Sequence, residues 1–458
     1  MRAVVLALVV CCAACQPFRP TPPPTPPVPA TYTSLGGTWQ PPHAWWQAWD
    51  APELHGLIQR ALAEGFDVRL AQSRLAQAQA AARKATAATL PTISGELSPE
   101  RRLSGGTGLP TVESTLWGLT GAASYEVDLW GKVAAHTAVA QLAVLQREEA
   151  LRTAAMTVSA EVATAWVDLV STTLQLQVAQ RQLREHERLL ASITQRYQEG
   201  AASVLDLETQ RKALAEARAI LPTLEATQAA RRAQLAVLCA LPGPGDVPIP
   251  HASLPQPWPI PQTGIPAALL DERPDIRLKA AAAYSAGFDL AAAQADRLPT
   301  LTLFGRLTAS GPNMGGILDT WLTRLLASLA GPIVDGGARR AEVDRAAAAQ
   351  EEAILDYART VAQAVAEADS ALAEVLAAQK TLETTTARLE AAQRVVAATQ
   401  DRYRAGTLEY PDLAQTLLQM HTLERTLIQH HATLLARHVA LVRALGKGWQ
   451  TLAPRNAS

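Results

Sequence analysis

The chain carries one sequence pattern twice, at a fixed offset. The first copy is Arg196-Tyr197-Gln198-Glu199-Gly200 followed by Asp206, and the second is Arg402-Tyr403-Arg404-Ala405-Gly406 followed by Asp412. Each residue of the second copy therefore lies 206 positions after its counterpart. The match extends upstream, where Asp67 and Leu90-Pro91-Thr92 recur as Asp275 and Leu298-Pro299-Thr300. Because an internal repeat sets the architecture of a chain, the sequence predicts a tandem duplication.

Composition changes along the chain predict where the two halves begin and end. Residues 41–241 form the first structural repeat, with a helix, two strands, a long helix and a return helix. A proline-rich linker, 242–266, separates it from the second repeat, 267–446, and residues 447–458 form a C-terminal tail.

The N-terminus has the features of a bacterial export signal. One early charge, Arg2, precedes the apolar run Ala3–Val10 and then Cys12-Ala13-Ala14-Cys15. Small residues directly before a cysteine resemble a lipobox, so we expect 1–14 to be a lipoprotein signal peptide and Cys15 to be acylated. An ordinary cleaved signal with an incidental cysteine is the alternative. Residues 15–40 then form a proline-rich tether in the extended polyproline II conformation.

Two stretches without proline predict very long helices. Residues 132–199 lack proline and, over ~68 residues at ~1.5 Å each, give a rod on the order of 100 Å. Residues 339–405 are the counterpart, and shorter helices over 204–241 and 411–445 return from each. A further helix is expected from Leu54 to Leu90. Each repeated pattern is then the tip of a helical hairpin.

Four stretches alternate between apolar and polar residues, as β-strands do. They begin near Ile93, Trp117, Leu301 and Trp321, and a glycine-rich loop at 105–110 separates the first two. Strands of roughly 10 to 13 residues have the length of a tilted transmembrane strand. Four strands cannot close a barrel, so a membrane-spanning sheet must be shared by two chains or by three. The residues alone leave both possibilities open.

Several motifs of the chain are specific enough to be compared with known families. They are the lipobox, Trp45-Trp46, Tyr125-Glu126-Val127-Asp128-Leu129-Trp130-Gly131, the segment 326–337 with Gly331-Pro332-Ile333-Val334-Asp335-Gly336-Gly337, and the two Arg-Tyr-x-x-Gly tips. Together they resemble the TolC/OprM family of outer-membrane efflux channels, in its NodT-type lipoprotein branch. The resemblance implies a mixed α and β fold. It implies a homotrimer with a twelve-stranded barrel in the outer membrane of a Gram-negative bacterium, four strands per chain, and an α-barrel in the periplasm.

The resemblance also implies partners and a function. The trimer would be the passive duct of a tripartite efflux system that exports small molecules. It would dock to a periplasmic adaptor protein and to an inner-membrane transporter of the RND type. The same fold serving type I protein secretion or metal-ion export is the alternative, and a soluble periplasmic coiled-coil scaffold is the rival class.

The hairpin tips are the candidate functional site. Gly200 and Gly406 each stand where a helix stops, the position that favours the left-handed conformation. Ser203 and Asp206 fit a capping box for the first return helix. With Tyr197 and Pro411 these residues define the tips.

The second tip carries the candidate periplasmic gate. Pro411 suits the first helical turn, and it places Asp412 near the helix N-terminus, where the dipole favours a carboxylate. Capping is thus one sufficient role for Asp206 and Asp412 alike. The alternative is a ring of three Asp412 carboxylates that attracts cations and responds to pH. By resemblance, Tyr403 and Arg402 hold the tips closed.

The gate departs from the family pattern at three positions. Gln415 stands where a second acidic residue is common, and Pro411 and Leu418 stand where leucine and arginine are common. Glu409 is the candidate for the missing charge.

Other chemistry finds little support in the sequence. His186-Glu187 would begin a zinc-protease motif, but residue 190 is leucine. We interpret His421, His430, His431 and His438 as histidines on a solvated helix. A net charge of −1 gives no basic field for nucleic acid. We predict no enzyme activity, no metal site and no cofactor.

Overall fold

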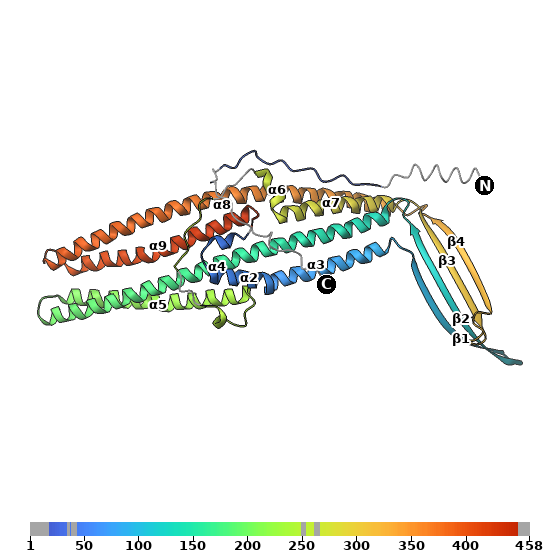
Figure 1. Cartoon of the computed structure of the whole chain (residues 1–458), viewed down its shortest axis with the longest axis horizontal. Helices are drawn as coiled ribbons and strands as arrows, with labels where there is room; N and C mark the ends of the chain where they lie inside the picture. Colours follow the sequence, from blue (N-terminus) through green and yellow to red (C-terminus); the bar gives the residue numbers. More distant parts are fainter. Residues whose placement is uncertain (1–17, 34–36, 38–43, 249–252, 261–265, 448–458) are drawn as a thin grey trace. The chain divides into compact units, whose positions relative to one another are not determined.

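The computed structural model describes residues 18–33, 37, 44–248, 253–260 and 266–447 (Figure 1). The predicted signal peptide and the predicted lipidation of Cys15 lie outside these residues. The chain divides into two compact units. One comprises the chain up to Pro26, Arg74–Glu148 and Leu278–Arg359, and the other comprises Pro27–Ser73, Glu149–Arg277 and the chain from Thr360 onward.

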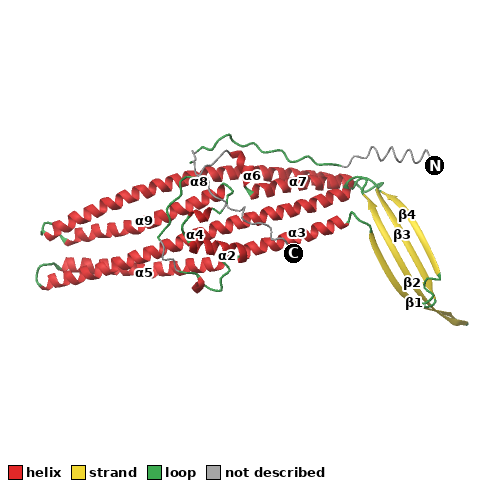
Figure 2. Cartoon of the chain, viewed as in Figure 1, coloured by secondary structure: helices red, strands yellow, loops and turns green. Residues whose placement is uncertain are grey.

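The first unit contains one antiparallel sheet of four strands (Figure 2). The strands are β1 (Thr92–Gly106), β2 (Leu109–Val127), β3 (Thr300–Gly311) and β4 (Thr320–Ala330), and they pair in chain order. The pairing of β2 with β3, from Trp117 opposite Gly311 to Val127 opposite Leu301, joins the two repeats. The four predicted strands are therefore present in the order that a duplicated hairpin gives.

The first two strands are longer than the sequence predicts. The glycine-rich stretch 105–110 was expected to be a loop, but β1 runs to Gly106 and β2 resumes at Leu109. They span 15 and 19 residues. Gly108 has a φ of 85°, a left-handed conformation that glycine adopts without steric cost. The expected loop is therefore a tight turn within a long ribbon.

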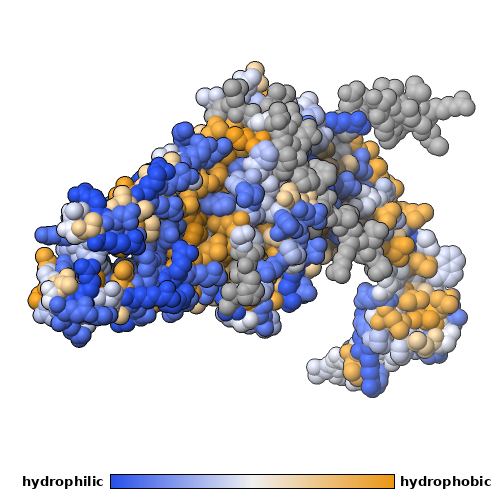
Figure 3. Space-filling view, turned by 60° about the vertical axis from the view of Figure 1, so that its left-hand side comes forward, coloured by the Kyte–Doolittle hydropathy of each residue, from blue (hydrophilic) through white to orange (hydrophobic). Residues whose placement is uncertain are grey.

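Apolar side chains of the sheet face outward. Trp321, Leu325 and Leu329 of β4 are 66%, 84% and 67% exposed, and Figure 3 shows apolar side chains gathered on the strands. Among the residues that the structure describes, no further strand lies beside the edge strands β1 and β4. A sheet with apolar faces and two unpaired edges is expected to be covered in the assembled protein.

Ion pairs fasten the helices that adjoin the sheet. Asp296 accepts from Lys132 Nζ at 2.5 Å and from Arg339 Nε at 3.1 Å, so one carboxylate joins the starts of two long helices. Trp130 donates its Nε1–H to the carbonyl of Pro299 at 2.7 Å. These contacts connect residues of the first repeat to residues of the second within this unit.

The helices repeat in the two halves of the chain. Those of the first repeat are α2 (Pro52–Glu64), α3 (Phe66–Ala87), α4 (Lys132–Gln198) and α5 (Val204–Leu238). Those of the second are α6 (Leu269–Glu272), α7 (Pro274–Ala295), α8 (Ala338–Arg404) and α9 (Tyr410–Ala444). The long helices α4 and α8 both have 67 residues, and the return helices α5 and α9 both have 35. The predicted long helices and hairpins are confirmed.

The single helix predicted from Leu54 to Leu90 is wrong. The chain breaks at Gly65, whose ψ of 138° is extended, and the second part ends at Ala87. A Cβ at Gly65 would lie 2.2 Å from the carbonyl oxygen of Ala61, so the close approach requires glycine. The second repeat breaks at the matching place, between α6 and α7.

Short 3-10 turns complete the described elements. They are η1 (Trp45–Ala48), η2 (Pro244–Asp246) and η3 (Pro266–Ala268). None of the described helices combines the length and the apolar character that a bilayer crossing requires.

The core of the second unit is built around tryptophan. Trp45 and Trp49 are 2% and 1% exposed, and the ring of Trp49 stacks on Trp258 with centroids 4.4 Å apart. These rings pack with Trp166 of α4 and Leu435 of α9. Trp45, Trp46 and Trp49 are therefore packing residues of this core. Trp258 lies in the predicted linker, which therefore contributes to the core.

Candidate functional site: the paired hairpin tips

The two hairpins turn in the same way. Gly200 and Gly406 have φ values of 74° and 73°. The amide of Gly200 donates to the carbonyl of Tyr197, and the amide of Ala201 donates to that of Arg196. In the second tip Gly406 and Thr407 donate to Tyr403 and Arg402 in the same pattern. Both helices thus end in a Schellman motif, which needs a left-handed residue where the glycine stands.

The return helices start differently. Ser203 and Asp206 cap α5 reciprocally: the Ser203 amide donates to Asp206 Oδ2 at 2.9 Å, and the Asp206 amide donates to Ser203 Oγ at 3.1 Å. At α9 the N-cap Glu409 makes no side-chain cap, and Pro411 occupies the first turn. Asp412 is exposed in that turn and makes no hydrogen bond or ion pair with another described residue. Capping therefore accounts for Asp206 but leaves Asp412 free.

An arginine and two tyrosines join the tips. Arg196 Nη1 donates to the hydroxyl of Tyr403 at 2.9 Å, and the guanidinium carbon lies 4.9 Å from the centre of the Tyr403 ring. The Tyr403 ring meets Tyr410 edge-on at 5.6 Å. Burial raises the pKa of Tyr403, against the opposing effect of Arg196. The phenol thus stays protonated and can act as donor or acceptor.

A small apolar cluster supports this contact from behind. Its buried members are Ile193, Leu207, Val396, Tyr410, Leu413, Ala414 and Leu417, and Leu189, Leu190, Tyr403 and Met420 pack against them. The residues come from both hairpins, so the cluster holds the two tips together within one chain.

Behind the cluster a buried line of polar groups crosses between the hairpins. The Tyr410 hydroxyl donates to Gln210 Oε1 at 2.5 Å, and Gln210 Nε2 donates to the carbonyl of His186 at 2.7 Å. The His186 ring meets that of His421 edge-on at 5.3 Å. His421 Nε2 lies 3.2 Å from Glu185 Oε2. The line joins α4 and α5 of one hairpin to α9 of the other.

The electrostatics of this line favour neutral imidazole at His186. Burial lowers the pKa of His186, and the neighbouring His421 lowers it further. The hydrogen bond from His421 lowers the pKa of Glu185, with weaker contributions from His186 and Arg181. Because Glu185 accepts from Nε2 of His421, that ring carries its proton on Nε2. Its Nδ1 is buried and has no hydrogen-bond partner among the described residues.

The structure places the predicted gate residues at the tips and leaves most of them unpaired. Arg402, Glu409, Asp412 and Gln415 are exposed, as are Gly200, Gly406 and Tyr197, the last at 41%. Among them only Tyr403 makes side-chain contacts across the tips. Pro411 is half-buried at the start of α9. Within one chain the gate residues do not meet one another.

The interpretation of the α9 histidines as solvated is wrong for two of them. His421 and His438 are both 2% exposed, because α9 packs against its neighbours on that side. His186 is 3% exposed.

Sequence reasoning missed Tyr410, Gln210 and the histidine pair. One signal in the sequence marks them, because each differs from its duplicated counterpart 206 positions away. The counterparts of Tyr410, Gln210, His186 and His421 are Val204, Thr416, Ala392 and Ala215. Within the described parts of the chain, no group of three His, Cys, Asp or Glu could hold a metal ion.

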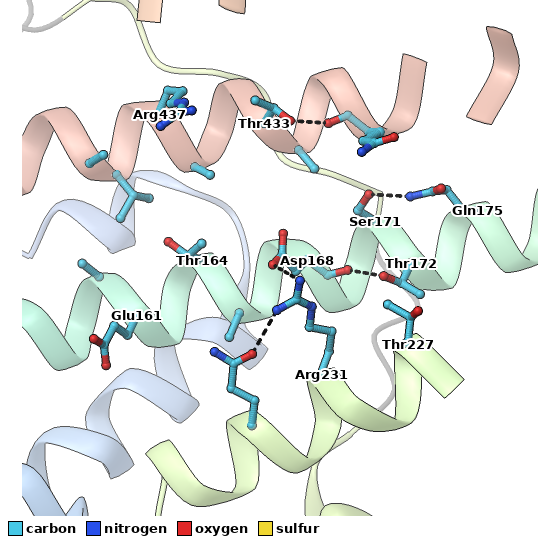
Figure 4. Close-up of a pocket in the computed structure, with 18 of the residues that line it drawn as sticks. Glu161, Thr164, Asp168, Ser171, Thr172, Gln175, Thr227, Arg231, Thr433 and Arg437 are labelled. Atoms are coloured by element: carbon cyan, nitrogen blue, oxygen red, sulfur yellow. Dashed lines mark hydrogen bonds and ion pairs between the residues drawn. The ribbon is translucent and has the colours of Figure 1, made fainter. Parts of the chain in front are cut away.

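A polar groove is the other candidate site. It has a volume of about 680 Å³ and lies between α4, α5 and α9 (Figure 4). Arg231 spans it to pair with Asp168 at 3.2 Å and donates to Gln234 at 3.1 Å. Burial raises the pKa of Asp168 and Arg231 opposes this. A small-molecule site is usually concave and mostly apolar, so this open, mixed-charge groove is a weaker candidate than the tips.

Both repeats match one family. The model of the outer membrane efflux protein family matches residues 57–240 and 265–447. The pyoverdine export outer membrane protein OpmQ of Pseudomonas aeruginosa is 32% identical over 420 residues, covering 89% of this chain and 88% of that protein. Nodulation protein T of Rhizobium leguminosarum bv. trifolii is 24% identical over 440 residues, covering 90% and 89%.

Solved structures share the fold. The structure of CusC aligns with a TM-score of 0.85 at 21% identity, covering 93% of this chain and 99% of that one. The outer-membrane channel OprN aligns with a TM-score of 0.85 at 24% identity, covering 94% and 99%.

Proposed function

The chain belongs to the outer membrane efflux protein family, and we propose that three copies form a duct for small organic molecules that is gated at the hairpin tips. Membership makes it the outer-membrane channel subunit of a tripartite efflux system. Channels of this family act with a periplasmic adaptor and an inner-membrane transporter. The observation that carries the proposal is the agreement of both repeats with one family model, together with two hairpins whose tips contact each other.

The sheet supports a shared barrel. Its four strands have apolar outward faces and two open edges, β1 and β4. Open edges in lipid leave backbone groups unpaired, at several kcal/mol each. Pairing β4 of each copy with β1 of the next satisfies both edges. Three copies then supply twelve strands, an even number within the range of bacterial barrels.

The free carboxylate of Asp412 supports a gate at the second tip. It has no capping partner and stands in the first turn of α9. Three copies around an axis place three like charges together, which attract cations and repel anions. Glu409 stands on the same turn as a second acid, and Gln415 lies one helical turn further on. Arg402 and Tyr403 complete the candidate gate.

The names of the relatives support a cargo, and the lipobox at Cys15 supports an anchor. The relatives at 32% and 31% identity are named for pyoverdine export, and others for antibiotic or toluene efflux, so we assign small organic molecules as cargo. A cation efflux protein, CusC, is 25% identical. An RND-type transporter would supply the energy, and acylation of Cys15 would anchor the channel in the outer membrane.

Export from cells tests the function. A strain without its own channels of this family is given this chain with or without a periplasmic adaptor and an inner-membrane transporter from the organism that encodes it. We expect export of small organic compounds to recover only with all three components. Recovery of secreted protein or of metal tolerance alone would instead favour type I secretion or metal export. A Cys15→Ala variant grown with [³H]palmitate tests the anchor, and label on the variant would contradict it.

A further inference from the structure

The contact between the tips is formed once in the chain, although the duplication supplies its residues twice. Arg196 of the first tip donates to Tyr403 of the second and lies over its ring. The residues 206 positions away are Arg402 and Tyr197. Both are exposed, and neither side chain makes a hydrogen bond, ion pair or ring contact with another described residue. The chain thus carries the two halves of a second contact on its two outer flanks.

Apolar residues on the same flanks repeat the pattern. Leu189 and Tyr410 belong to the cluster between the tips. Their counterparts in the duplication are Val395 and Val204, which are 51% and 57% exposed. An exposed pair of apolar side chains at these two positions is what a second, unassembled copy of the same interface would show.

We propose that Arg402 of one copy donates to the Tyr197 hydroxyl of the neighbouring copy, with Val395 and Val204 packed behind it. In a ring of copies the two tips alternate, so every second tip-to-tip interface lies between chains. The residues available at such an interface are the duplicated counterparts, 206 positions away in the sequence, of the residues that form the interface within the chain. The inference rests on the proposed ring of tips and identifies the residues that close it.

The interface between chains is less apolar than the one within the chain. Ala414 and Leu417 of the cluster have Glu208 and Arg211 as counterparts. These two form an exposed ion pair at 2.6 Å on α5. The buried polar line also has no equivalent, since Ala392 and Ala215 replace the two histidines. The interface between chains should therefore separate more readily than the interface within the chain.

Cross-linking between cysteines tests the contact in the full-length protein in membranes. The double variant Arg402→Cys with Tyr197→Cys is treated with a short bifunctional maleimide and run on a denaturing gel. Since each chain carries both halves, the expected product is a covalent dimer and trimer. The matched control, Arg196→Cys with Tyr403→Cys, should be cross-linked within the chain and run as a monomer. Each single-cysteine variant and the native chain provide the background.

Two measurements decide the inference. A monomer from the first pair, when the control pair is cross-linked, would overturn it. Dimer and trimer from the first pair, above the single-cysteine background, would support it. The second measurement does not rely on cysteine variants. Arg402→Lys keeps the positive charge but loses the planar guanidinium group. We expect it to raise hydrogen exchange of residues 196–201 in the assembled protein. Unchanged exchange there would count against the contact.

The gate proposal can fail separately. If the cross-link forms but does not reduce single-channel conductance or its fluctuations, the contact stands and the tips are not the gate. If the cross-link is absent and Asp412 still controls selectivity, the gate stands and the contact fails.

Discussion

The two hairpin tips share one backbone and differ in what holds them. Both end in a glycine at a φ near 74° with the same pair of carbonyl hydrogen bonds. At the first tip a capping box fixes the start of the return helix, and Tyr197 is exposed. At the second tip there is no side-chain cap, and Tyr403 packs on Arg196 and on Tyr410 instead.

The difference shows which features duplication preserves. The turn depends on backbone conformation, so glycine is required in both copies. The side chains around it contact different neighbours, and they have diverged accordingly. The first tip is stabilised by local hydrogen bonds, whereas the second is stabilised by tertiary packing and leaves its aspartate free. The second tip is therefore the more responsive to changes in the interface.

Removing the buried ring of Tyr410 should have the largest effect. Tyr410→Ala leaves a cavity beside Leu413 and deprives Gln210 of its donor, which costs on the order of 4 kcal/mol. Val204→Ala, the counterpart, should cost less than about 1 kcal/mol, since Val204 is 57% exposed in the chain. Hydrogen exchange of the first turns of α9 and α5 measures both, with Tyr410→Phe reporting the hydroxyl alone.

The comparison between tips depends on this contrast. If Tyr410→Ala and Val204→Ala loosened their helices equally, packing would not distinguish the second tip from the first. A large effect of Val204→Ala confined to the assembled trimer would instead favour the interface between chains.

Lowering the pH should have the next largest effect, and it should destabilise α9 more than α5. His438 of α9 is buried against Trp258, and burial lowers its pKa to about 4. A histidine whose folded pKa is below 6.5 stabilises the fold above pH 6.5 and loses that contribution as pH falls toward 4. Between pH 7.5 and 5 the loss is about 2 kcal/mol. The lowered pKa of His186 acts in the same direction. The counterparts of His421 and His438 on α5 are Ala215 and Arg232.

Hydrogen exchange at the two pH values, corrected for intrinsic rates, measures this difference. His438→Leu should remove part of the acid response of α9. His136→Gln, which changes an exposed histidine of α4, is the control and should leave that response intact. An acid response that is equal on α5 and α9 would refute the assignment.

The sequence predicts the backbone of this protein well because its signals are local. The long helices lack proline, Gly200 and Gly406 stop them, and Ser203 with Asp206 starts the next. Each of these depends on residues a few positions apart. The break at Gly65 is only partly local: a Cβ there would lie 2.2 Å from the carbonyl oxygen of Ala61, four residues earlier, and 3.1 Å from that of Leu238, which the sequence does not place beside it. The long ribbon of β1 and β2 likewise depends on one turn at Gly108.

The candidate site was predicted in its position and only partly in its contacts. Glycine and tyrosine motifs located the tips. Gln210, His186 and His421 are far apart in sequence, and on a helix their polar side chains are typical of a solvated face. Their burial depends on how the two hairpins pack. For His186 and His421 the available signal was the departure from the duplicated counterpart, because a polar residue that replaces alanine in only one repeat needs a partner.

Removing the side chain at the N-cap position of each return helix should give a smaller difference in stability between the tips. Ser203→Ala removes a hydrogen bond of the capping box and should cost about 1 kcal/mol at the start of α5. Glu409→Ala should change the start of α9 by less than about 0.5 kcal/mol, because Glu409 makes no side-chain cap. Protection of the first-turn amides measures both. Equal losses would mean that α9 is capped in the assembled protein by a group from another chain.

Replacing Asp412 should have the smallest effect on stability and the clearest effect on function. Asp412→Asn removes a charge that contacts no described residue, so unfolding should change by less than about 0.5 kcal/mol. If three such charges line the entrance, single-channel cation selectivity should fall. Asp206→Asn is the matched control at the first tip: it weakens the capping box and should leave selectivity unchanged. Selectivity that is unchanged in Asp412→Asn would remove this residue from the gate, and selectivity that falls in both variants would assign the field to both tips. A fall in Asp412→Asn alone would mean that duplication produced two aspartates with separate roles, one holding a helix and one facing the passing ions.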